Sequence, residues 1–161
     1  MFYKGDKIVY PIYGGGIVED IEQNETGKYY IISILFGGLK IKLSVLKAEN
    51  IGIRKVSPQS EIIDTIKKVV SNTNINIDKS YSENWNHRYK QNFKKIKTGK
   101  LLEVAEVFKI LKLKEKEKKL SDIEKKMLNN TKQIIISEII LSNNIVKEKA
   151  EELLANLLIS C

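Results

Sequence analysis

The hydrophobic period of the chain changes at Ser57-Pro58, and this change constrains the fold more than any other feature. Before it, apolar residues fall in short β-branched runs broken by Pro11 and by glycines, a pattern typical of strands. After it, apolar residues recur every three or four positions, the spacing of amphipathic helices. We therefore expect a β domain over residues 1–57 and a helical domain over residues 58–161.

The first half contains four runs that predict strands, which are KIVYPIY, GGIVEDIEQ, YYIISILF and LKIKLSVL. Gly37-Gly38 separates the last two runs and predicts a β-hairpin, because both glycines tolerate positive φ. The triple glycine at 14–16 leads into another strand and not into a helix, so it predicts a tight turn or bulge instead of a phosphate-binding loop. So many short strands in so few residues predict a small barrel or a strongly bent sheet.

The second half predicts a bundle of about five helices. Ser57 and Pro58 suit the N-cap and the first position of the first helix. The expected spans are 58–70, 82–97, 101–111, 121–143 and 146–159. Gly99 should end the second helix. The charged stretch KLKEKEKK should separate the third helix from a capping box at 121–124. The predicted fold class is α+β, a β domain followed by helices.

The composition excludes several functional classes. A single cysteine, at position 161, and a single histidine, His87, leave no disulfide framework, no plausible metal centre and no catalytic triad. We therefore expect no metal, no cofactor, no small-molecule substrate and no enzymatic activity. No run of 18 apolar residues occurs and the N-terminus lacks the apolar block of a secretory signal, so we expect a cytoplasmic protein with no membrane partner.

The net charge of +8 indicates an anionic partner or a surface that lysines keep soluble. The excess lies in the second half. Residues 1–57 carry 8 Lys/Arg against 6 Asp/Glu, whereas residues 58–161 carry 20 against 14. Any contact with an anionic partner is therefore expected mainly on the helices.

The only tryptophan, Trp85, begins an apolar stripe on the second predicted helix. At about 100° per residue, Tyr89, Phe93 and Ile96 all fall within about 80° of Trp85. A tryptophan at this spacing is often a core residue. Its place in the first turn, however, also suits an exposed aromatic that stacks on an unpaired base or enters a strained minor groove. The pattern alone leaves both interpretations open.

Cationic side chains border this stripe on both flanks. His87, Lys90 and Lys94 spread over the face opposite the core, and Arg88 lies on the other flank, one turn from Trp85. Cations beside an exposed aromatic are typical of sites that bind nucleic-acid phosphates, although lysines on a helix face are commonly just solvated.

An ordered series of stretches resembles the CarD family of bacterial transcription regulators, also known as CdnL. The stretches are FYKGDKIVYPIYGGGIVEDIE, LKIKLSVLKAENIGIRKV, NWNHRYKQNFKKIKTGKLLEVAEVFKIL and LSDIEKKMLNNTKQIIISEI. The resemblance covers nearly the whole chain. It implies a Tudor-like β domain that binds the β subunit of RNA polymerase, followed by a helical domain that contacts promoter DNA at the upstream edge of the transcription bubble.

The same resemblance implies individual site residues. Trp85 matches the tryptophan with which the family wedges into the minor groove, and Arg88, Lys90 and Lys125 match cations that hold the DNA backbone. His87 stands where relatives commonly carry an arginine, and Lys94 extends the same face. On the β domain, the polymerase-facing edge should be LKIKLSV with Lys40 and Lys42, and Asn24 stands near an arginine of some relatives.

The sequence therefore predicts a non-enzymatic regulator that binds RNA polymerase and stabilises the open promoter complex without recognising a base sequence. Two alternatives stay open. One is an adaptor on RNA polymerase with no direct DNA contact, and the other is a small basic RNA-binding protein.

Overall fold

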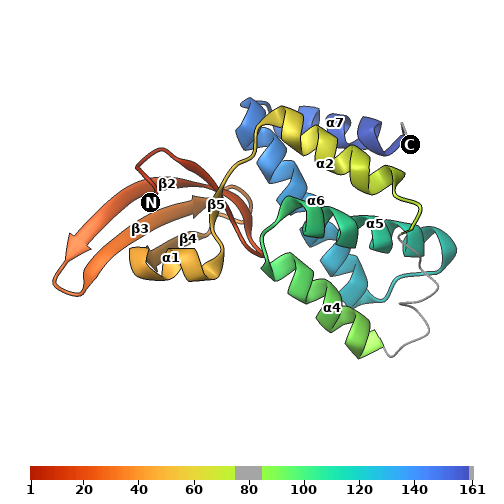
Figure 1. Cartoon of the computed structure of the whole chain (residues 1–161), viewed down its shortest axis with the longest axis horizontal. Helices are drawn as coiled ribbons and strands as arrows, with labels where there is room; N and C mark the ends of the chain where they lie inside the picture. Colours follow the sequence, from red (N-terminus) through yellow and green to blue (C-terminus); the bar gives the residue numbers. More distant parts are fainter. Residues whose placement is uncertain (75–84, 160–161) are drawn as a thin grey trace.

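Five antiparallel strands form one sheet in the computed structural model, which describes residues 1–74 and 85–159 (Figure 1). The strands are β1 (Lys7–Tyr10), β2 (Gly14–Asn24), β3 (Gly27–Ile34), β4 (Lys40–Ser44) and β5 (Arg54–Lys55). Their order, β4-β3-β2-β1-β5, leaves β4 and β5 at the two edges. The sheet is open and bent, so the predicted α+β class is confirmed and a closed barrel is not formed.

The predicted tight turn lies at residues 11–13, directly before the triple glycine, and Gly14 follows it at positive φ as the first residue of β2, whereas no bulge falls within Gly14–Gly16. This strand lies against helix α6 (Asp122–Asn143), so residues without a side chain are needed at these positions. A Cβ atom on Gly15 would lie 2.8 Å from Leu141 Cδ1 and 3.1 Å from the Ser137 backbone. The irregularity in β2 falls later, between Val18 and Asp20. The glycines thus permit a close approach between sheet and helix.

The predicted hairpin is confirmed, with Gly37 and Gly38 both at positive φ between β3 and β4. The run LKIKLSVL, however, does not stay extended. It ends as a strand at Ser44 and continues into a short helix, α1 (Val45–Ile51), which the strand pattern did not predict. Ala48 on this helix is buried against the apolar face of the sheet. Gly52 then ends α1 in the left-handed conformation.

The helices after the sheet, among the described residues, are α2 (Gln59–Ser71), α4 (Trp85–Lys97), α5 (Leu101–Glu117), α6 and α7 (Lys147–Ile159). Residues 82–84 of the predicted second helix lie outside the described residues. The charged stretch after Leu111 does not separate two helices, because α5 continues through it to Glu117. Lysine and glutamate are good helix formers, and Lys112 and Glu115 form an ion pair on this turn.

Two predicted helix signals are confirmed on α6. Ser121 is the N-cap of a complete capping box with Glu124, and Asn144 ends the helix in the left-handed conformation. A third prediction was wrong, since Pro58 and not Ser57 is the N-cap of α2. The Ser57 N–H instead donates to Glu138 Oε1 at 2.9 Å, which draws this residue to α6.

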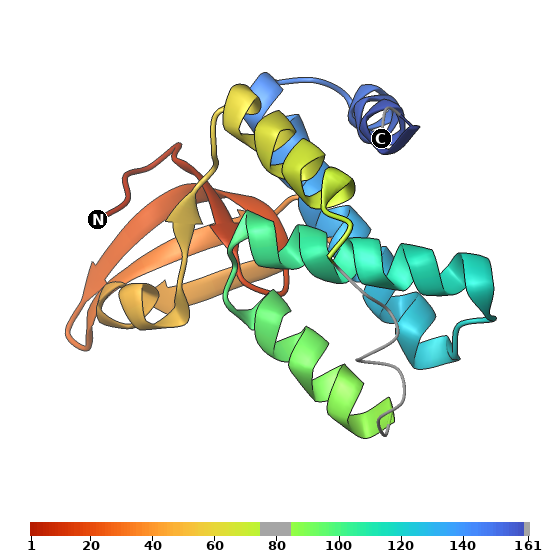
Figure 2. The same ribbon diagram turned by 45° about the vertical axis from the view of Figure 1, so that its right-hand side comes forward.

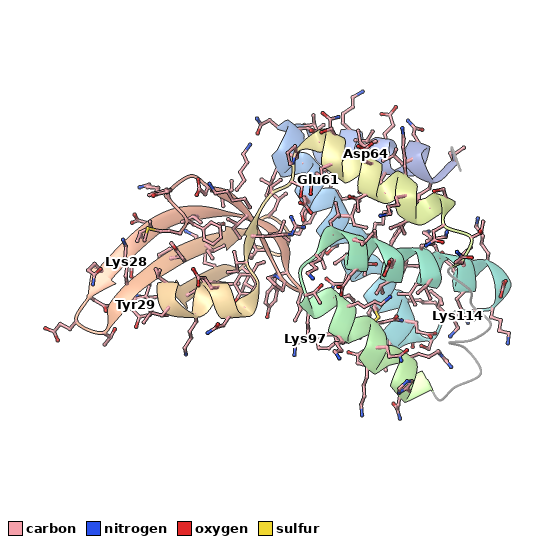
Figure 3. The ribbon with its side chains drawn as sticks, in the orientation of Figure 1. Lys28, Tyr29, Glu61, Asp64, Lys97 and Lys114 are labelled. Carbon is pink, nitrogen blue, oxygen red and sulfur yellow. The ribbon has the colours of Figure 1, made fainter. Side chains whose placement is uncertain are left out.

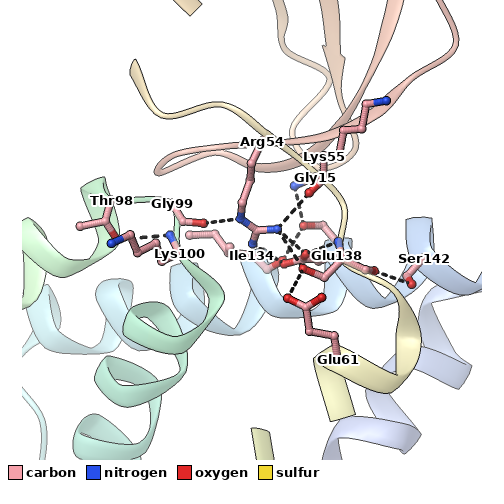
Figure 4. Close-up of polar contacts among 12 residues, drawn as sticks. Gly15, Arg54, Lys55, Glu61, Thr98, Gly99, Lys100, Ile134, Glu138 and Ser142 are labelled. Carbon is pink, nitrogen blue, oxygen red and sulfur yellow. Dashed lines mark hydrogen bonds and ion pairs between the residues drawn. The ribbon is translucent and has the colours of Figure 1, made fainter. Parts of the chain in front are cut away.

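A network of buried and partly buried polar contacts joins the sheet to the helices (Figure 4). Arg54 on β5 donates to both carboxylate oxygens of Glu138, at 2.6 and 2.8 Å, and to the Gly99 carbonyl at 2.9 Å. Glu138 is fully buried. The Gly15 N–H also donates to Ser137 Oγ at 2.7 Å. The sheet and α6 are thus held in one defined orientation.

The arrangement places α4 with one end at the sheet and the other far from it. Figures 1 and 2 both show α4 running from the outer end of the helices back toward the sheet. At the near end, Gly99 packs against Pro11, and a Cβ on Gly99 would lie 2.9 Å from Pro11 Cγ. Trp85 therefore begins the helix at the end remote from the sheet.

Candidate nucleic-acid interface

The apolar stripe of α4 becomes more exposed toward its N-terminus. Ile96 is buried at 1% exposure, Phe93 is half-buried, and Tyr89 is 37% exposed. Tyr89 and Phe93 stack with their ring centroids 5.9 Å apart. The side chain of Trp85 lies outside the part of the chain that the structure describes. The stripe is therefore a core element at one end and a surface element at the other.

The predicted cationic side chains of α4 lie at its surface. His87, Lys90 and Lys94 are exposed, and the imidazole of His87 hydrogen bonds with the Gln91 amide at 2.9 Å. Arg88 is half-buried on the other flank of the stripe. Further along, Lys97 lies over the Phe93 ring, with its nitrogen 5.6 Å from the centroid. The helix thus presents a cationic face beside its exposed aromatic end.

A hollow of about 410 Å³ lies on the Arg88 side of α4, between α4, the end of α5 and the start of α6. We call it the basic hollow because four of its lining residues are cations. It is lined by Arg88, Lys114, Lys118, Lys119, Ser121, Ile123 and Glu124. Figure 3 shows Lys114 at the outer end of α5. None of these residues except Arg88 was predicted as part of a site.

Glu124 contributes the carboxylate of the basic hollow, and two contacts hold it in place. Lys114 Nζ donates to Glu124 Oε1 at 2.5 Å, and the Ser121 N–H donates to Oε2 at 3.1 Å. Burial works to raise the pKa of Glu124, but the hydrogen bonds from Lys114 and Ser121 outweigh it and hold this pKa below its ordinary value. Glu124 is therefore favoured in its ionised form, and its carboxylate is already paired with groups of the protein.

An apolar groove of about 560 Å³ lies on the other flank of α4, between α4 and α6. It is lined by Asn86, Tyr89, Phe93, Ile96, Ile123, Lys126, Met127 and Asn130. Ile123, which is 45% exposed, lines both the apolar groove and the basic hollow. The outer part of α4 and the first turns of α6 thus form one face with a cationic hollow and an apolar groove side by side.

Lys125, a predicted backbone contact, is exposed on α6 and lines neither the groove nor the hollow. At about 100° per residue it lies about 200° around α6 from Ile123, on the side away from α4. The structure therefore does not bring Lys125 together with Arg88. Its predicted role stays a prediction.

The lysines of the basic hollow lie in a charged run of the sequence, and such a run is typical both of a connection between helices and of an anion-binding surface. The charged run KLKEKEKK contains Lys114, Lys118 and Lys119 and was interpreted only as a separator between helices. Its closeness to Arg88 arises because α5 and α6 turn back beside the start of α4. Such a contact between distant segments has no periodic signature along the chain.

The predicted polymerase-facing strand, β4, is an edge of the sheet. Ile34 N–H donates to the Leu39 carbonyl, one position beyond the Ser33–Lys40 pair at which the β3–β4 register ends. Because hydrogen-bonded pairs alternate in an antiparallel ladder, the backbone groups of Lys40 and Lys42 point away from β3. These two residues thus present N–H and C=O groups along an open edge.

The side chains of Lys40 and Lys42 form ion pairs within the sheet. Lys40 Nζ lies 2.9 Å from Glu19 and Lys42 Nζ lies 2.5 Å from Glu22. The Lys40 hydrogen bond is also the leading cause that lowers the pKa of Glu19. Lys42 additionally lies 5.1 Å from the centroid of the Tyr29 ring. Both lysines are exposed, but their charges are partly neutralised by neighbouring strands.

Asn24 lies at the end of the β2–β3 hairpin, where its side chain serves the turn. Its Oδ1 accepts from the Thr26 N–H at 3.0 Å and from Thr26 Oγ1 at 2.6 Å. Figure 3 places the neighbouring Lys28 and Tyr29 near this end of the sheet. Asn24 is thus beyond the Lys40–Lys42 edge, and its proposed contact with polymerase stays a prediction.

Residues 1–74 and 85–159 show neither a metal-binding cluster nor a membrane-spanning helix. They contain no group of three His, Cys, Asp or Glu side chains placed to hold a metal ion. Over the same part of the chain, no helix is both long and apolar enough to cross a membrane.

Comparisons with known proteins match both parts of this architecture. Residues 2–57 match the family model described as CarD-like/TRCF RID domain, and residues 70–155 match the model described as CarD, C-terminal domain. A Bacillus subtilis (strain 168) protein named "Putative transcription factor YdeB" is 35% identical over 153 residues, which cover 92% of this chain and 97% of that protein. The chain therefore belongs to the CarD family of transcription regulators.

Proposed function

We propose that this chain binds the β subunit of RNA polymerase through the edge strand β4 and stabilises the open promoter complex with its helices. In this proposal, the outer end of α4 contacts DNA at the upstream edge of the transcription bubble, without enzymatic chemistry. The observation that carries the proposal is that one molecule has both an open strand edge and a helix with exposed cations. Figures 1 and 2 show β4 in the sheet and the start of α4 at the end of the helices remote from the sheet.

The strand edge supports binding by β-augmentation, in which a strand of the partner adds to an exposed sheet edge. The outward backbone groups of Lys40 and Lys42 would supply the hydrogen bonds. Leu39 and Leu46 flank this edge, with exposed fractions of 41% and 87%. An extended edge with apolar residues at both ends suits a protein partner, and the match of residues 2–57 to the CarD-like/TRCF RID domain supports RNA polymerase as that partner.

The face on α4 supports DNA contact of a kind that recognises shape. Lys90, Lys94 and Arg88 would hold backbone phosphates, which positions a protein without specifying sequence. Trp85, at the outer end of the apolar stripe, would occupy the space at a distorted base step and oppose closure of the bubble. Stacking of this kind contributes about 1–3 kcal/mol per base.

Replacing the backbone donor of the edge tests the polymerase contact. Lys42→Pro removes an N–H that points away from β3, so the ladder within the sheet should survive. We expect this variant to lose retention of RNA polymerase in a pull-down with the full chain. Lys42→Gln keeps the N–H and removes only the charge, so it should retain most of the binding.

The matched control is Lys67→Gln on the remote helix α2, which also removes one exposed charge. It should bind polymerase as the parent does. Circular dichroism should show that Lys42→Pro keeps its fold. Folded Lys42→Pro that still retains polymerase would move the interface away from β4.

A further inference from the structure

The basic hollow brings together cations from two separate segments, α4 and the stretch 114–119. Arg88 comes from α4, Lys114 from the end of α5, and Lys118 and Lys119 from the connection between α5 and α6. Lys118 and Lys119 are exposed, and among the described residues no carboxylate lies within ion-pair distance of either. The hollow therefore has two cations that nothing in the described structure neutralises.

The charge of the lining is unbalanced. Against four cations it has one carboxylate, Glu124, and that group is already held by Lys114 and by the Ser121 N–H. Ile123, the apolar lining residue, is exposed at the boundary with the apolar groove. An anionic group fits this environment, and a neutral or cationic group does not.

The kind of anion follows from the donors that line the hollow. A free terminal phosphate is usually cradled by backbone N–H groups, but here the Glu124 N–H already donates to Ser121 Oγ at 3.3 Å. Lys118 and Lys119 carry point charges on flexible side chains, which suits contact with a phosphate of a nucleic-acid backbone. Binding there is favoured because each phosphate that is neutralised releases counterions. The hollow also adjoins the cationic face of α4, so a continuous chain of phosphates can follow both.

We infer that the basic hollow seats a backbone phosphate of DNA, with Lys118 and Lys119 as contacts beyond those of α4. This inference rests on the proposed DNA contact and extends it to the connection between α5 and α6. One strand would then run from the cationic face of α4 past Arg88 and into the hollow. The contact carries no sequence information, because it is made to the backbone.

The test is the salt dependence of binding to a fork-shaped DNA, a duplex that opens into two single strands. The full chain is compared with Lys118→Gln/Lys119→Gln by fluorescence anisotropy across a series of salt concentrations. The loss of one phosphate contact should reduce the slope of log K against log salt by about 0.7–0.9. Affinity at the lowest salt should fall several-fold, and by the same factor for forks of different sequence.

The matched control is Lys67→Gln/Lys68→Gln, which removes two adjacent exposed lysines from α2. It should keep the slope of the parent. A second arm replaces single phosphates of the fork by neutral methylphosphonates. At one position the replacement should weaken the parent but not Lys118→Gln/Lys119→Gln, which shows that this phosphate lies in the hollow.

Several outcomes would overturn the inference. An unchanged slope for Lys118→Gln/Lys119→Gln, or an equal loss in the α2 control, would remove the phosphate from the hollow while leaving the DNA contact of α4 intact. Tight binding of inorganic pyrophosphate, or of single-stranded RNA in preference to the fork, that depends on these lysines would assign the hollow to another anion. If the parent itself shows no salt-dependent fork binding, the proposed DNA contact fails as well.

Discussion

At the scale of single residues, the contact between Arg54 and Glu138 matters most for the architecture. The Glu138 carboxylate is fully buried and accepts from Arg54 and from the Ser57 N–H. Arg54→Ala would leave this carboxylate buried without its cation, and such a loss typically costs about 3–5 kcal/mol. We expect a decrease of that order in the free energy of unfolding, measured by urea denaturation.

A double variant separates the ion pair from the rest of the junction. Arg54→Met/Glu138→Leu removes both charges, so much of the stability lost in Arg54→Ala should return. If Arg54→Ala alone costs less than 1 kcal/mol, the pair does not hold the junction, and the close packing of the glycines against α6 must do so.

Sequence patterns predicted the contacts of single residues less well than they predicted helices and strands. Trp85, Arg88 and the α4 lysines stood out because their spacing places them on one helix. Glu138 did not, since a glutamate among isoleucines shows nothing of a partner 84 positions away. Lys118 and Lys119 were visible only as part of a charged run. Their closeness to Arg88 is a consequence of how the end of α5 packs beside α4.

At the scale of elements, the contact between β2 and α6 depends on the absence of side chains. Gly15→Ala would place a methyl group 2.8 Å from Leu141 Cδ1 and 3.1 Å from the Ser137 backbone. We expect this overpacking to destabilise the protein by about 1–3 kcal/mol in urea denaturation. Gly37→Ala is the comparison, because nothing lies within 4 Å there and only its positive φ is affected. Because a positive φ is itself costly for alanine, the refuting result is a Gly15→Ala protein as stable as the parent.

The N-terminus of α6 should make the protein sensitive to acid. The pKa of Glu124 is lowered in the folded state, so its contribution to stability is present above the ordinary value of 4.5. That contribution is lost as pH falls below 4.5 and through the lowered folded pKa. Glu124→Gln should be less stable at pH 7, and its stability should fall less than the parent's on acidification. Parallel pH profiles for the two proteins would contradict this.

Elements were predicted well where the signals were local. The capping box at Ser121, the αL residue Asn144 and the Gly37-Gly38 hairpin were each specified by a few adjacent residues and are confirmed. The errors arose where tertiary packing decided the outcome. Helix α1 forms because Ala48 can bury against the sheet, and Ser57 gives up the cap of α2 to donate to Glu138.

At the scale of the whole molecule, the junction holds the sheet and the helices in one orientation. The partly buried contacts of Arg54 and Ser57 with Glu138 and the buried contact of Gly15 with Ser137 fix the sheet against α6 (Figure 4). A chain held at its β4 edge would therefore present the outer end of α4 in a fixed place. Tethering of this kind raises the effective concentration of a weak DNA contact without new interactions.

This coupling predicts that the junction can be weakened without losing the polymerase contact. Arg54→Lys keeps a cation but not the bidentate fork, so it should loosen the orientation more than it unfolds the chain. We expect polymerase retention near that of the parent and weaker stabilisation of open complexes. If Arg54→Lys retains polymerase and stabilises open complexes as well as the parent does, a fixed orientation is not required.

The most direct test of the central claim is the lifetime of open promoter complexes after a competitor is added to sequester free polymerase. With about 1–3 kcal/mol of stacking at stake, the parent chain should lengthen this lifetime by roughly 5-fold or more over polymerase alone. Trp85→Ala should remove most of that gain while still being retained by polymerase in a pull-down. A Trp85→Ala chain that lengthens the lifetime as much as the parent would contradict the account.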